Sequence, residues 1–429
     1  MALKYDYQEK FSKISKSPPF PSLPESDQRF IREKAFKYRF TLQELRQITE
    51  IALDFSLWNE PSIIEAWPIG KDLEPGKETK KALLKGLRER WNTLKIQPKY
   101  PHNQQSKAQA SYPKPELIVR EKDTLGLGRC PVASTKTRCC NLLTLDAIEN
   151  CGFDCSYCSI QSFYHGNKIH FDSRFARKLK NLRLDPNQIY HIGTGQSSDS
   201  LMWGNKNGVL DSLIAFARDN PNVILELKTK SKNIAYLLRH PVPRNIICSW
   251  SLNTPTIISH EEHHTASVEK RLNAARRIAD KGLVVGFHFH PMVHYDDWRE
   301  QYSAVFEALL DRFDPSEVAM ISLGTLTFIK PVIRQIRSRN FKSKILQMPM
   351  VDADGKLSYP VETKLEMFSY AFENLRAWHE RVFFYLCMEN HRLWNKVFGY
   401  EYPSNEAFET AMKRSYMAKI GNSSFIAPR

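Results

Sequence analysis

The sequence contains no apolar run of about 18 residues, so we expect no membrane-spanning helix. Glycine is scarce, at 17 of 429 residues, and the 24 prolines follow no repeat, which excludes collagen-like and low-complexity proteins. The first 24 residues are charged, are interrupted by prolines and lack the apolar core of a secretory signal. We therefore expect a cytoplasmic protein. In that compartment, the eight cysteines do not indicate a disulfide framework.

Positive charge is present in excess. Lys and Arg number 62 against 47 Asp and Glu, which gives a formal net charge of +15. Such proteins often bind polyanions, because Lys and Arg displace counterions from phosphates. A basic surface that only keeps the protein in solution explains the same charge. Two groups of basic residues could flank a nucleic acid: Arg174, Arg177, Lys178 and Lys180, and then Lys330, Arg334, Arg337, Arg339, Lys342 and Lys344.

The N-terminal quarter of the chain differs from the rest in its pattern. Ser26 is placed to cap one helix, and Thr41 with Glu44 forms a capping box at the start of a second. Leucines at helical spacing predict a third helix over 83–94. The polar, proline-flanked segment 100–116 is typical of a linker. We predict a basic, mostly helical N-terminal region over 1–115, followed by a larger domain with a C-terminal extension over 116–429.

Apolar runs alternate with helical segments after residue 140, in six consecutive β-α units. This alternation predicts a parallel sheet with right-handed crossovers. Six units are too few for a closed eightfold barrel and favour a partial (β/α)6 barrel, with an open doubly wound sheet as the alternative. Either fold places its chemistry at the carboxyl ends of the strands. The expected strands are 141–148, 188–195, 223–230, 245–253, 283–292 and 318–326, the last one followed by a helix near 330–339.

A cysteine motif follows the first of these strands. Cys151, Cys155 and Cys158 form C-x3-C-x2-C on a short loop. Three thiolates could bind three corners of a cubane iron–sulfur cluster and leave one iron open for a ligand. The same thiolates could hold zinc with His165 or His170, although zinc fingers favour two C-x2-C pairs. Three buried structural cysteines at this spacing are the least favoured interpretation.

Polar residues end several of the later strands and are candidate ligand contacts. Gly193-Thr194-Gly195 ends the second strand, where a glycine turn lets a ligand approach the backbone, although a plain tight turn has the same sequence. Lys230 ends the third strand and could pair with a carboxylate; Lys228 shares its face and is the alternative. Further candidates are Ser251 and Asn253 after the fourth strand, His288 and His290 on the fifth, and Tyr295 and Trp298 as base-stacking aromatics.

The cysteine motif and its β-α context resemble the radical S-adenosylmethionine (SAM) superfamily. Several segments resemble its spore photoproduct lyase-like (DNA repair photolyase) branch in particular. The resemblance covers about residues 140–399, and the segments that carry it are 150–164, 191–201, 225–231, 249–277, 285–298 and 385–399.

The resemblance implies a chemistry for these positions. Cys151, Cys155 and Cys158 would bind a [4Fe-4S] cluster, whose fourth iron would chelate SAM. Reduction by an external one-electron donor such as flavodoxin or ferredoxin would yield a 5′-deoxyadenosyl radical, which abstracts a hydrogen atom from the substrate. Photoproduct lyases of this branch use it to reverse a thymine–thymine adduct in DNA. The SAM contacts implied on this chain are Tyr157, Gly193, Thr194, Gly195, Lys230, Ser251 and Asn253.

The sequence departs from this branch at two positions. Gln196 stands where the lyases have a cysteine that returns a hydrogen atom to the product radical, and Ser159 stands where they have a tyrosine. An amide cannot donate a hydrogen atom as a thiol does. Another thiol could replace the donor, and the clustered Cys130, Cys139 and Cys140 could instead bind a second metal, supply a redox thiol or be buried free cysteines.

We therefore expect a radical SAM enzyme that acts on nucleic acid, most simply a DNA photolesion lyase. The alternatives are a radical SAM enzyme for RNA, protein or a small molecule, and a metal-bearing nucleic-acid-binding protein without catalysis.

Overall fold

The structure is a computed structural model. It describes residues 2–68, 74–96, 98–101, 115–130, 136–163, 168–339 and 341–421. Most of the expected linker 100–116 lies outside these residues. The chain divides into two compact units: one comprises Met1–Ala110, His294–Asp296 and Thr327–Tyr359, and the other comprises Ser111–Val293, Asp297–Leu326 and Pro360–Arg429. The expected domain boundary at 115/116 stays a prediction, and the first unit also takes in a segment of the expected barrel domain.

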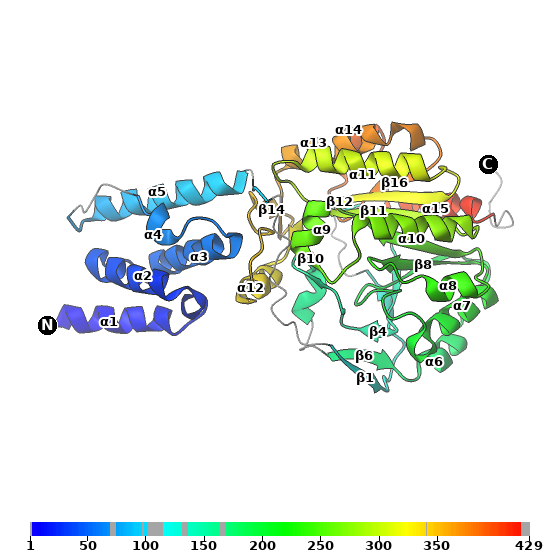
Figure 1. Cartoon of the computed structure of the whole chain (residues 1–429), viewed down its shortest axis with the longest axis horizontal. Helices are drawn as coiled ribbons and strands as arrows, with labels where there is room; N and C mark the ends of the chain where they lie inside the picture. Colours follow the sequence, from blue (N-terminus) through cyan, green and yellow to red (C-terminus); the bar gives the residue numbers. More distant parts are fainter. Residues whose placement is uncertain are drawn as a thin grey trace. The chain divides into compact units, whose positions relative to one another are not determined.

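The first unit is mainly helical and has one small sheet (Figure 1). The predicted capping box is confirmed: the backbone N–H of Thr41 donates to Glu44 at 2.7 Å, and the N–H of Glu44 donates to the Thr41 hydroxyl at 3.2 Å. The Ser26 cap is wrong, because that helix begins one residue earlier, after Pro24. The elements are α1 (Ala2–Ser15), α2 (Glu25–Tyr38), α3 (Leu42–Trp58), α4 (Ile63–Ala66), α5 (Lys77–Ile96), α12 (Lys330–Ser338) and the strands β13 (Thr327–Phe328), β14 (Val351–Ala353) and β15 (Lys356–Ser358).

A buried carboxylate joins α12 to α3 within this unit. Asp54, on α3, is 1% exposed and accepts hydrogen bonds from the Arg337 guanidinium of α12 at 2.9 and 2.8 Å. The Trp91 indole of α5 donates to the same carboxylate at 3.1 Å. Because an unpaired buried charge is costly, Asp54 fixes three helices that are far apart in the sequence.

We predict that Asp54→Ala destabilises this unit by about 3 kcal/mol, since it leaves Arg337 without its buried partner. Glu50→Ala is the matched control: Glu50 lies one turn earlier on α3, and its half-exposed carboxylate is 3.8 Å from the same Arg337. That change should cost less than about 1 kcal/mol. Urea unfolding followed by tryptophan fluorescence measures both, and equal losses would contradict the central role of Asp54.

The second unit is built around an eight-stranded sheet (Figure 1). Its strand order is β16-β12-β11-β9-β8-β7-β3-β2, with every neighbouring pair parallel except β2 and β3. The strands are β2 (Leu127–Arg129), β3 (Leu143–Leu145), β7 (Tyr190–Thr194), β8 (Val223–Thr229), β9 (Ile246–Ser251), β11 (Val285–Met292), β12 (Val318–Thr325) and β16 (Phe383–Leu386). All six predicted strands are present, and the sheet curls into the partial barrel that was expected.

Helices and short strands surround this sheet. The helices are α6 (Phe175–Asn181), α7 (Val209–Asp219), α8 (Ala235–Arg239), α9 (Pro255–Glu261), α10 (Val268–Asp280), α11 (Trp298–Arg312), α13 (Val361–Asn374), α14 (Arg392–Phe398) and α15 (Asn405–Lys419). The short strands are β1 (Glu116–Arg120), β4 (Ile148–Glu149) and β6 (Lys168–Asp172), which pair together, and β5 (Asp154–Cys155), which pairs with β10 (Glu262–His263).

The final β-α unit differs from the expectation. The helix predicted near 330–339 exists as α12, but it belongs to the first unit. Within the barrel unit, β12 is followed instead by α13, which packs on that strand and leads to the additional parallel strand β16.

The two faces of the sheet differ in polarity. On β8, Leu225 and Leu227 point to one side, and Glu226 and Lys228 point to the other. Glu226 bonds His288 of β11 at 2.7 Å, although β9 lies between β8 and β11 in the sheet. Side chains on this polar face therefore meet across an intervening strand, so the polar face is the concave one. The interior is therefore a polar surface suited to a polar ligand.

Helix α15 packs where the strands begin. The ring of Tyr416 meets His191 of β7 edge-on, and the Lys419 ammonium bonds the carbonyl of Pro315 just before β12. The carboxyl ends, where chemistry was expected, lie at the other end of the strands. No described helix is long and apolar enough to cross a membrane.

Candidate active site

The cysteine loop lies past the carboxyl end of β3. Cys151, Cys155 and Cys158 are partly exposed residues, and none of the three forms a disulfide. Cys155 belongs to β5 and pairs with Glu262 of β10, and the backbone N–H of Ser156 donates to the carbonyl of Glu261 at 2.8 Å. These backbone bonds fix the loop against a segment more than one hundred residues away.

A second contact holds the start of the loop. A Cβ on Gly152 would come within 2.4 Å of the Met202 methyl group and 2.8 Å of the Trp203 ring, so the loop packs closely against these two side chains. Asp199 holds the opposing turn by accepting from the N–H groups of Leu201 and Met202 at 3.0 and 2.9 Å. The same carboxylate accepts from the N–H of Lys230 at 2.7 Å, which ties this turn to the end of β8.

Lys230 connects the cysteine loop to a buried ion pair. Its ammonium lies 3.6 Å from the Cys155 sulfur and donates to the Tyr157 hydroxyl at 2.5 Å. The Tyr157 hydroxyl in turn donates to Glu262, which also binds the Arg271 guanidinium at 2.5 Å. Arg271 is fully buried, and it donates to the carbonyl of Ser251 at 2.8 Å. Of the residues predicted to contact SAM, Tyr157, Lys230 and Ser251 thus lie in one network.

The pKa shifts in this network keep Glu262 negatively charged and Lys230 positively charged. Burial alone would raise the pKa of Glu262, but Arg271 and Lys230 outweigh burial and hold that pKa at about 2. Burial alone would lower the pKa of Lys230, but Cys155 and Glu262 outweigh it and raise the pKa. Burial raises the pKa of the Cys155 thiol to about 12, with Lys230 opposing the rise. A permanent positive charge therefore lies beside one cysteine of the motif.

The Gly193-Thr194-Gly195 turn lies at the end of the neighbouring strand β7. Gly195 has φ +82°, and a Cβ there would be 2.7 Å from the Ser200 hydroxyl, so both conformation and space require glycine. The Thr194 hydroxyl is within 2.7 Å of the same Ser200 hydroxyl. The turn therefore has a defined shape with its backbone close to its surroundings.

Asn253 is positioned differently from the other candidates. It is 1% exposed, donates to the carbonyl of Pro291 at 2.9 Å and accepts from the Tyr302 hydroxyl at 2.7 Å. Its predicted contact with SAM stays a prediction, and its observed bonds join β9 to β11 and α11.

A buried hydrogen-bond network crosses the barrel interior below this site. Glu226 of β8 bonds His191 of β7 at 2.9 Å, Ser249 of β9 at 2.7 Å and His288 of β11 at 2.7 Å. His288 also bonds Ser322 of β12 at 2.6 Å. Glu226 was not among the candidates expected from the sequence, where it is a lone glutamate within an apolar run.

The pKa values in this network follow from its charges. Burial alone would raise the pKa of Glu226, but Lys228 and hydrogen bonds from His191 and His288 hold it well below its usual range. Burial lowers the pKa of His288 despite its bond to Glu226, and burial together with His288 lowers the pKa of His290 to about 3. Both histidines are therefore neutral near pH 7 and can donate and accept hydrogen bonds.

The three thiols of the motif suit a cluster better than a single ion. Among the described residues, no three His, Cys, Asp or Glu side chains converge closely enough to hold one metal ion. The thiolates of a cubane cluster each bind a different iron atom and are therefore farther apart than the ligands of zinc. Of the two histidines considered for zinc, His165 lies outside the described residues.

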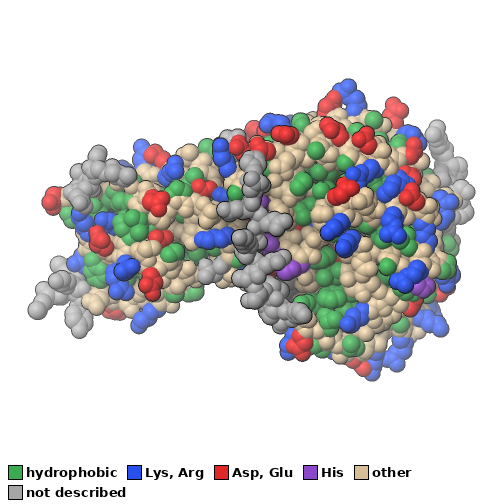
Figure 2. Space-filling model, in the orientation of Figure 1, with side chains coloured by type: hydrophobic (Ala, Val, Ile, Leu, Met, Phe, Trp, Pro, Cys, Tyr) green, Lys and Arg blue, Asp and Glu red, His purple; other side chains and the backbone are tan. Residues whose placement is uncertain are grey.

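The candidate base-stacking aromatics are buried, and several of the candidate basic residues are held in ion pairs. Tyr295 and Trp298 are 2% and 1% exposed, so their rings cannot stack on a base, and that prediction is wrong. Several basic candidates are held in ion pairs: Arg174 with Glu121, Lys178 with Asp172, Arg337 with Asp54, and Lys344 with Glu60. Over the face shown in Figure 2, basic and acidic side chains are interspersed.

Comparison with known proteins identifies the fold. The family model of spore photoproduct lyase matches residues 144–360. The chain belongs to the spore photoproduct lyase family. This confirms the resemblance inferred from the cysteine motif and its neighbouring segments.

The curated relatives are distant and match in part. The spore photoproduct lyases of Clostridium acetobutylicum and of a Geobacillus species are 24% and 26% identical to this chain over 181 and 203 residues. The alignments cover 41% and 46% of this chain and 53% and 59% of the relatives, so the chain spans less than two thirds of their length.

Solved structures of spore photoproduct lyase share the fold. The enzyme complexed with dinucleoside spore photoproduct has a TM-score of 0.52 at 20% identity. A double mutant with bound AdoMet and the dinucleoside has a TM-score of 0.52 at 19% identity. Both matches cover 82% of this chain and 96% of the solved one, and they confirm the radical SAM type of partial barrel.

We predict that Glu226→Gln lowers the free energy of unfolding by about 3 kcal/mol near neutral pH, because Lys228 loses its buried counter-charge. The folded pKa of Glu226 lies below its unfolded value of about 4.3, so its stabilisation is present above that pH. The stabilisation is lost as the pH falls through the folded pKa. Denaturant unfolding at several pH values should therefore show the difference between wild type and variant shrinking below about pH 4.

The control is Glu317→Gln, which weakens a partly exposed pair with Arg276 on the outside of the same unit. It should cost less than about 1 kcal/mol. A Glu226→Gln variant as stable as this control would show that the interior network is not essential for the barrel.

Proposed function

We propose that this chain is a radical SAM enzyme that repairs a thymine–thymine photoproduct in DNA. The observation that carries the proposal is the C-x3-C-x2-C loop at the carboxyl end of β3, beside Lys230, in a chain of the spore photoproduct lyase family. The donor set fits the cofactor: three partly exposed thiols on one loop can hold a [4Fe-4S] cluster and leave one iron for SAM.

Bound together, the cluster and SAM supply a radical that abstracts a hydrogen atom, with an electron from an external carrier such as a flavodoxin or ferredoxin. The protein's own residues hold and shape the site. Lys230 balances the negative charge of the thiolates through its position beside Cys155. Tyr157 and Glu262 fix the direction of that ammonium, and Gly195 lets the turn at the end of β7 pack closely against Ser200.

The polar interior supports a polar substrate. The network of Glu226, Ser249 and His288, together with Lys228, makes the concave face of the sheet polar at a level below the cysteine loop. The net charge of +15 favours a polyanion, and the solved relatives bind dinucleoside spore photoproduct. Together, these observations favour DNA over RNA, protein or a small molecule.

We predict that Cys151→Ala, Cys155→Ala or Cys158→Ala removes the iron of this cluster, about four atoms per chain, because only three protein ligands hold it. After anaerobic reconstitution and reduction, none of the three should form 5′-deoxyadenosine from SAM. Cys248→Ala is the control: this cysteine is fully buried on β9, on the face opposite Ser249, and should keep both properties. Cofactor cleavage in any of the three motif variants would contradict the assignment.

We predict that duplex DNA binding weakens steeply with salt. If about five phosphates are engaged, log K should fall against log salt with a slope near −4 to −5. A duplex with a photoproduct and one without it should give the same slope, because their phosphates are the same, while the damaged duplex binds more tightly at every salt concentration. Fluorescence anisotropy measures both, and no binding at low salt would remove DNA from the proposal.

A further inference from the structure

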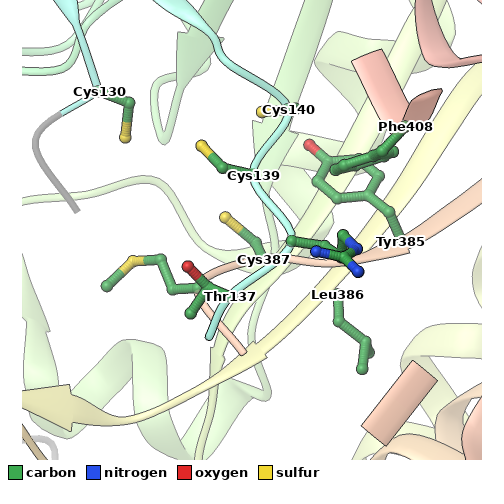
Figure 3. A pocket seen from close by; sticks show the side chains of 10 residues that line it. Cys130, Thr137, Cys139, Cys140, Tyr385, Leu386, Cys387 and Phe408 are labelled. Atoms are coloured by element: carbon green, nitrogen blue, oxygen red, sulfur yellow. The ribbon is translucent and has the colours of Figure 1, made fainter. Parts of the chain in front are cut away.

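Four cysteines outside the C-x3-C-x2-C loop surround one pocket of the barrel unit. Cys130 follows β2, Cys139 and Cys140 precede β3, and Cys387 follows β16. Figure 3 shows their side chains gathered around a common space from three separate segments. The four cysteines line one small pocket, and none of the four forms a disulfide.

The backbone on each side of this group is held in place. The N–H of Cys130 donates to Leu142 at 3.0 Å, and the N–H of Cys387 donates to Leu323 at 2.7 Å. The N–H of Cys139 donates to the Asn405 side chain at 3.0 Å. The cysteines are therefore positioned before any ligand binds.

The two segments that supply Cys139 and Cys387 are also joined to each other. Thr137 pairs with Asn390 as an antiparallel bridge, and the N–H of His391 donates to the carbonyl of Lys136 at 2.9 Å. The Arg138 guanidinium adds a bond to the carbonyl of Tyr402 at 2.6 Å. These contacts bring opposite edges of the eight-stranded sheet together at the four thiols.

The surroundings differ from those of a structural cysteine. Cys248 is fully buried on β9, and burial alone raises the pKa of its thiol, as is usual for a structural cysteine. The four grouped thiols line a common pocket instead, and the ammonium of Lys228 has favourable electrostatic interactions with Cys130, Cys140 and Cys387. Thiols gathered beside a cation are suited to holding negative charge.

We propose that Cys130, Cys139, Cys140 and Cys387 bind a second iron–sulfur cluster. Four cysteines are the usual complement of a [4Fe-4S] cluster, and each thiol gives up its proton on binding. Lys228 partly balances the resulting charge.

Spacing favours a cluster over a single zinc ion at this site. Zinc holds four thiolates at about 2.3 Å, which requires them to converge on one point. No described group of three or more such ligands converges in this way, and this holds equally for Cys151, Cys155 and Cys158.

Lys228 also relates the second group to the first. Lys228 lies on β8, and Lys230 is the first residue after that strand. Lys228 has favourable electrostatic interactions with three thiols of the second group, and Lys230 lies 3.6 Å from Cys155. The end of β8 thus contributes one lysine to each group.

The test counts iron in the full chain when the first cluster cannot form. In Cys151→Ala/Cys155→Ala/Cys158→Ala, anaerobic reconstitution with ferrous iron and sulfide should leave about four iron atoms and about four sulfides per chain, against about eight of each in the wild type. Adding Cys387→Ala to the triple variant should reduce both to below about one. Adding Cys248→Ala instead should change neither.

Loss of all iron in the triple variant, zinc bound without sulfide, or iron that survives Cys387→Ala would each overturn the proposal. Circular dichroism checks that the triple variant is folded. If it is not, the wild-type count decides: about eight iron atoms supports a second cluster and about four contradicts it. None of these readouts depends on SAM cleavage or DNA, so the result is independent of the proposed function.

Discussion

The partial barrel depends on one buried carboxylate. Glu226 bonds side chains from β7, β9 and β11, and through His288 it reaches β12. A charge this deeply buried is stable only if its partners stay in place, so it fixes the register of neighbouring strands. It also makes the concave face polar. Without Glu226, the ammonium of Lys228 would have no carboxylate partner inside the sheet.

The site at the carboxyl ends follows from this arrangement. Lys230 is the first residue after β8, the strand that carries Glu226, and its ammonium lies 3.6 Å from the Cys155 sulfur of the cysteine loop. The Glu262 carboxylate pairs with that ammonium at 3.3 Å, and Arg271 in turn holds Glu262 in place. The cysteine loop, which has little regular structure of its own, is held by partners on rigid elements, as a reactive site requires.

The predictable features were those encoded over short stretches. Thr41 and Glu44 are three residues apart, and the three cysteines of the motif span eight residues, so both could be recognised from sequence. Tyr157 and Glu262 are 105 residues apart, and no local pattern links them. The helix near 330–339 could be predicted from the sequence, but the sequence pattern did not show that this helix, α12, belongs to the first unit. Cys387 and Cys139 line one pocket although they are far apart in the sequence, and no local pattern could predict that they lie together.

The central proposal is that this chain reverses a thymine–thymine adduct in DNA, and one measurement tests it directly. A duplex with a single spore photoproduct is incubated anaerobically with the reconstituted, reduced protein and SAM, then digested to nucleosides for mass spectrometry. The account predicts that the adduct disappears and two thymidines appear in its place, only when SAM is present. Formation of 5′-deoxyadenosine with the adduct left intact would contradict the account and assign the radical to another substrate.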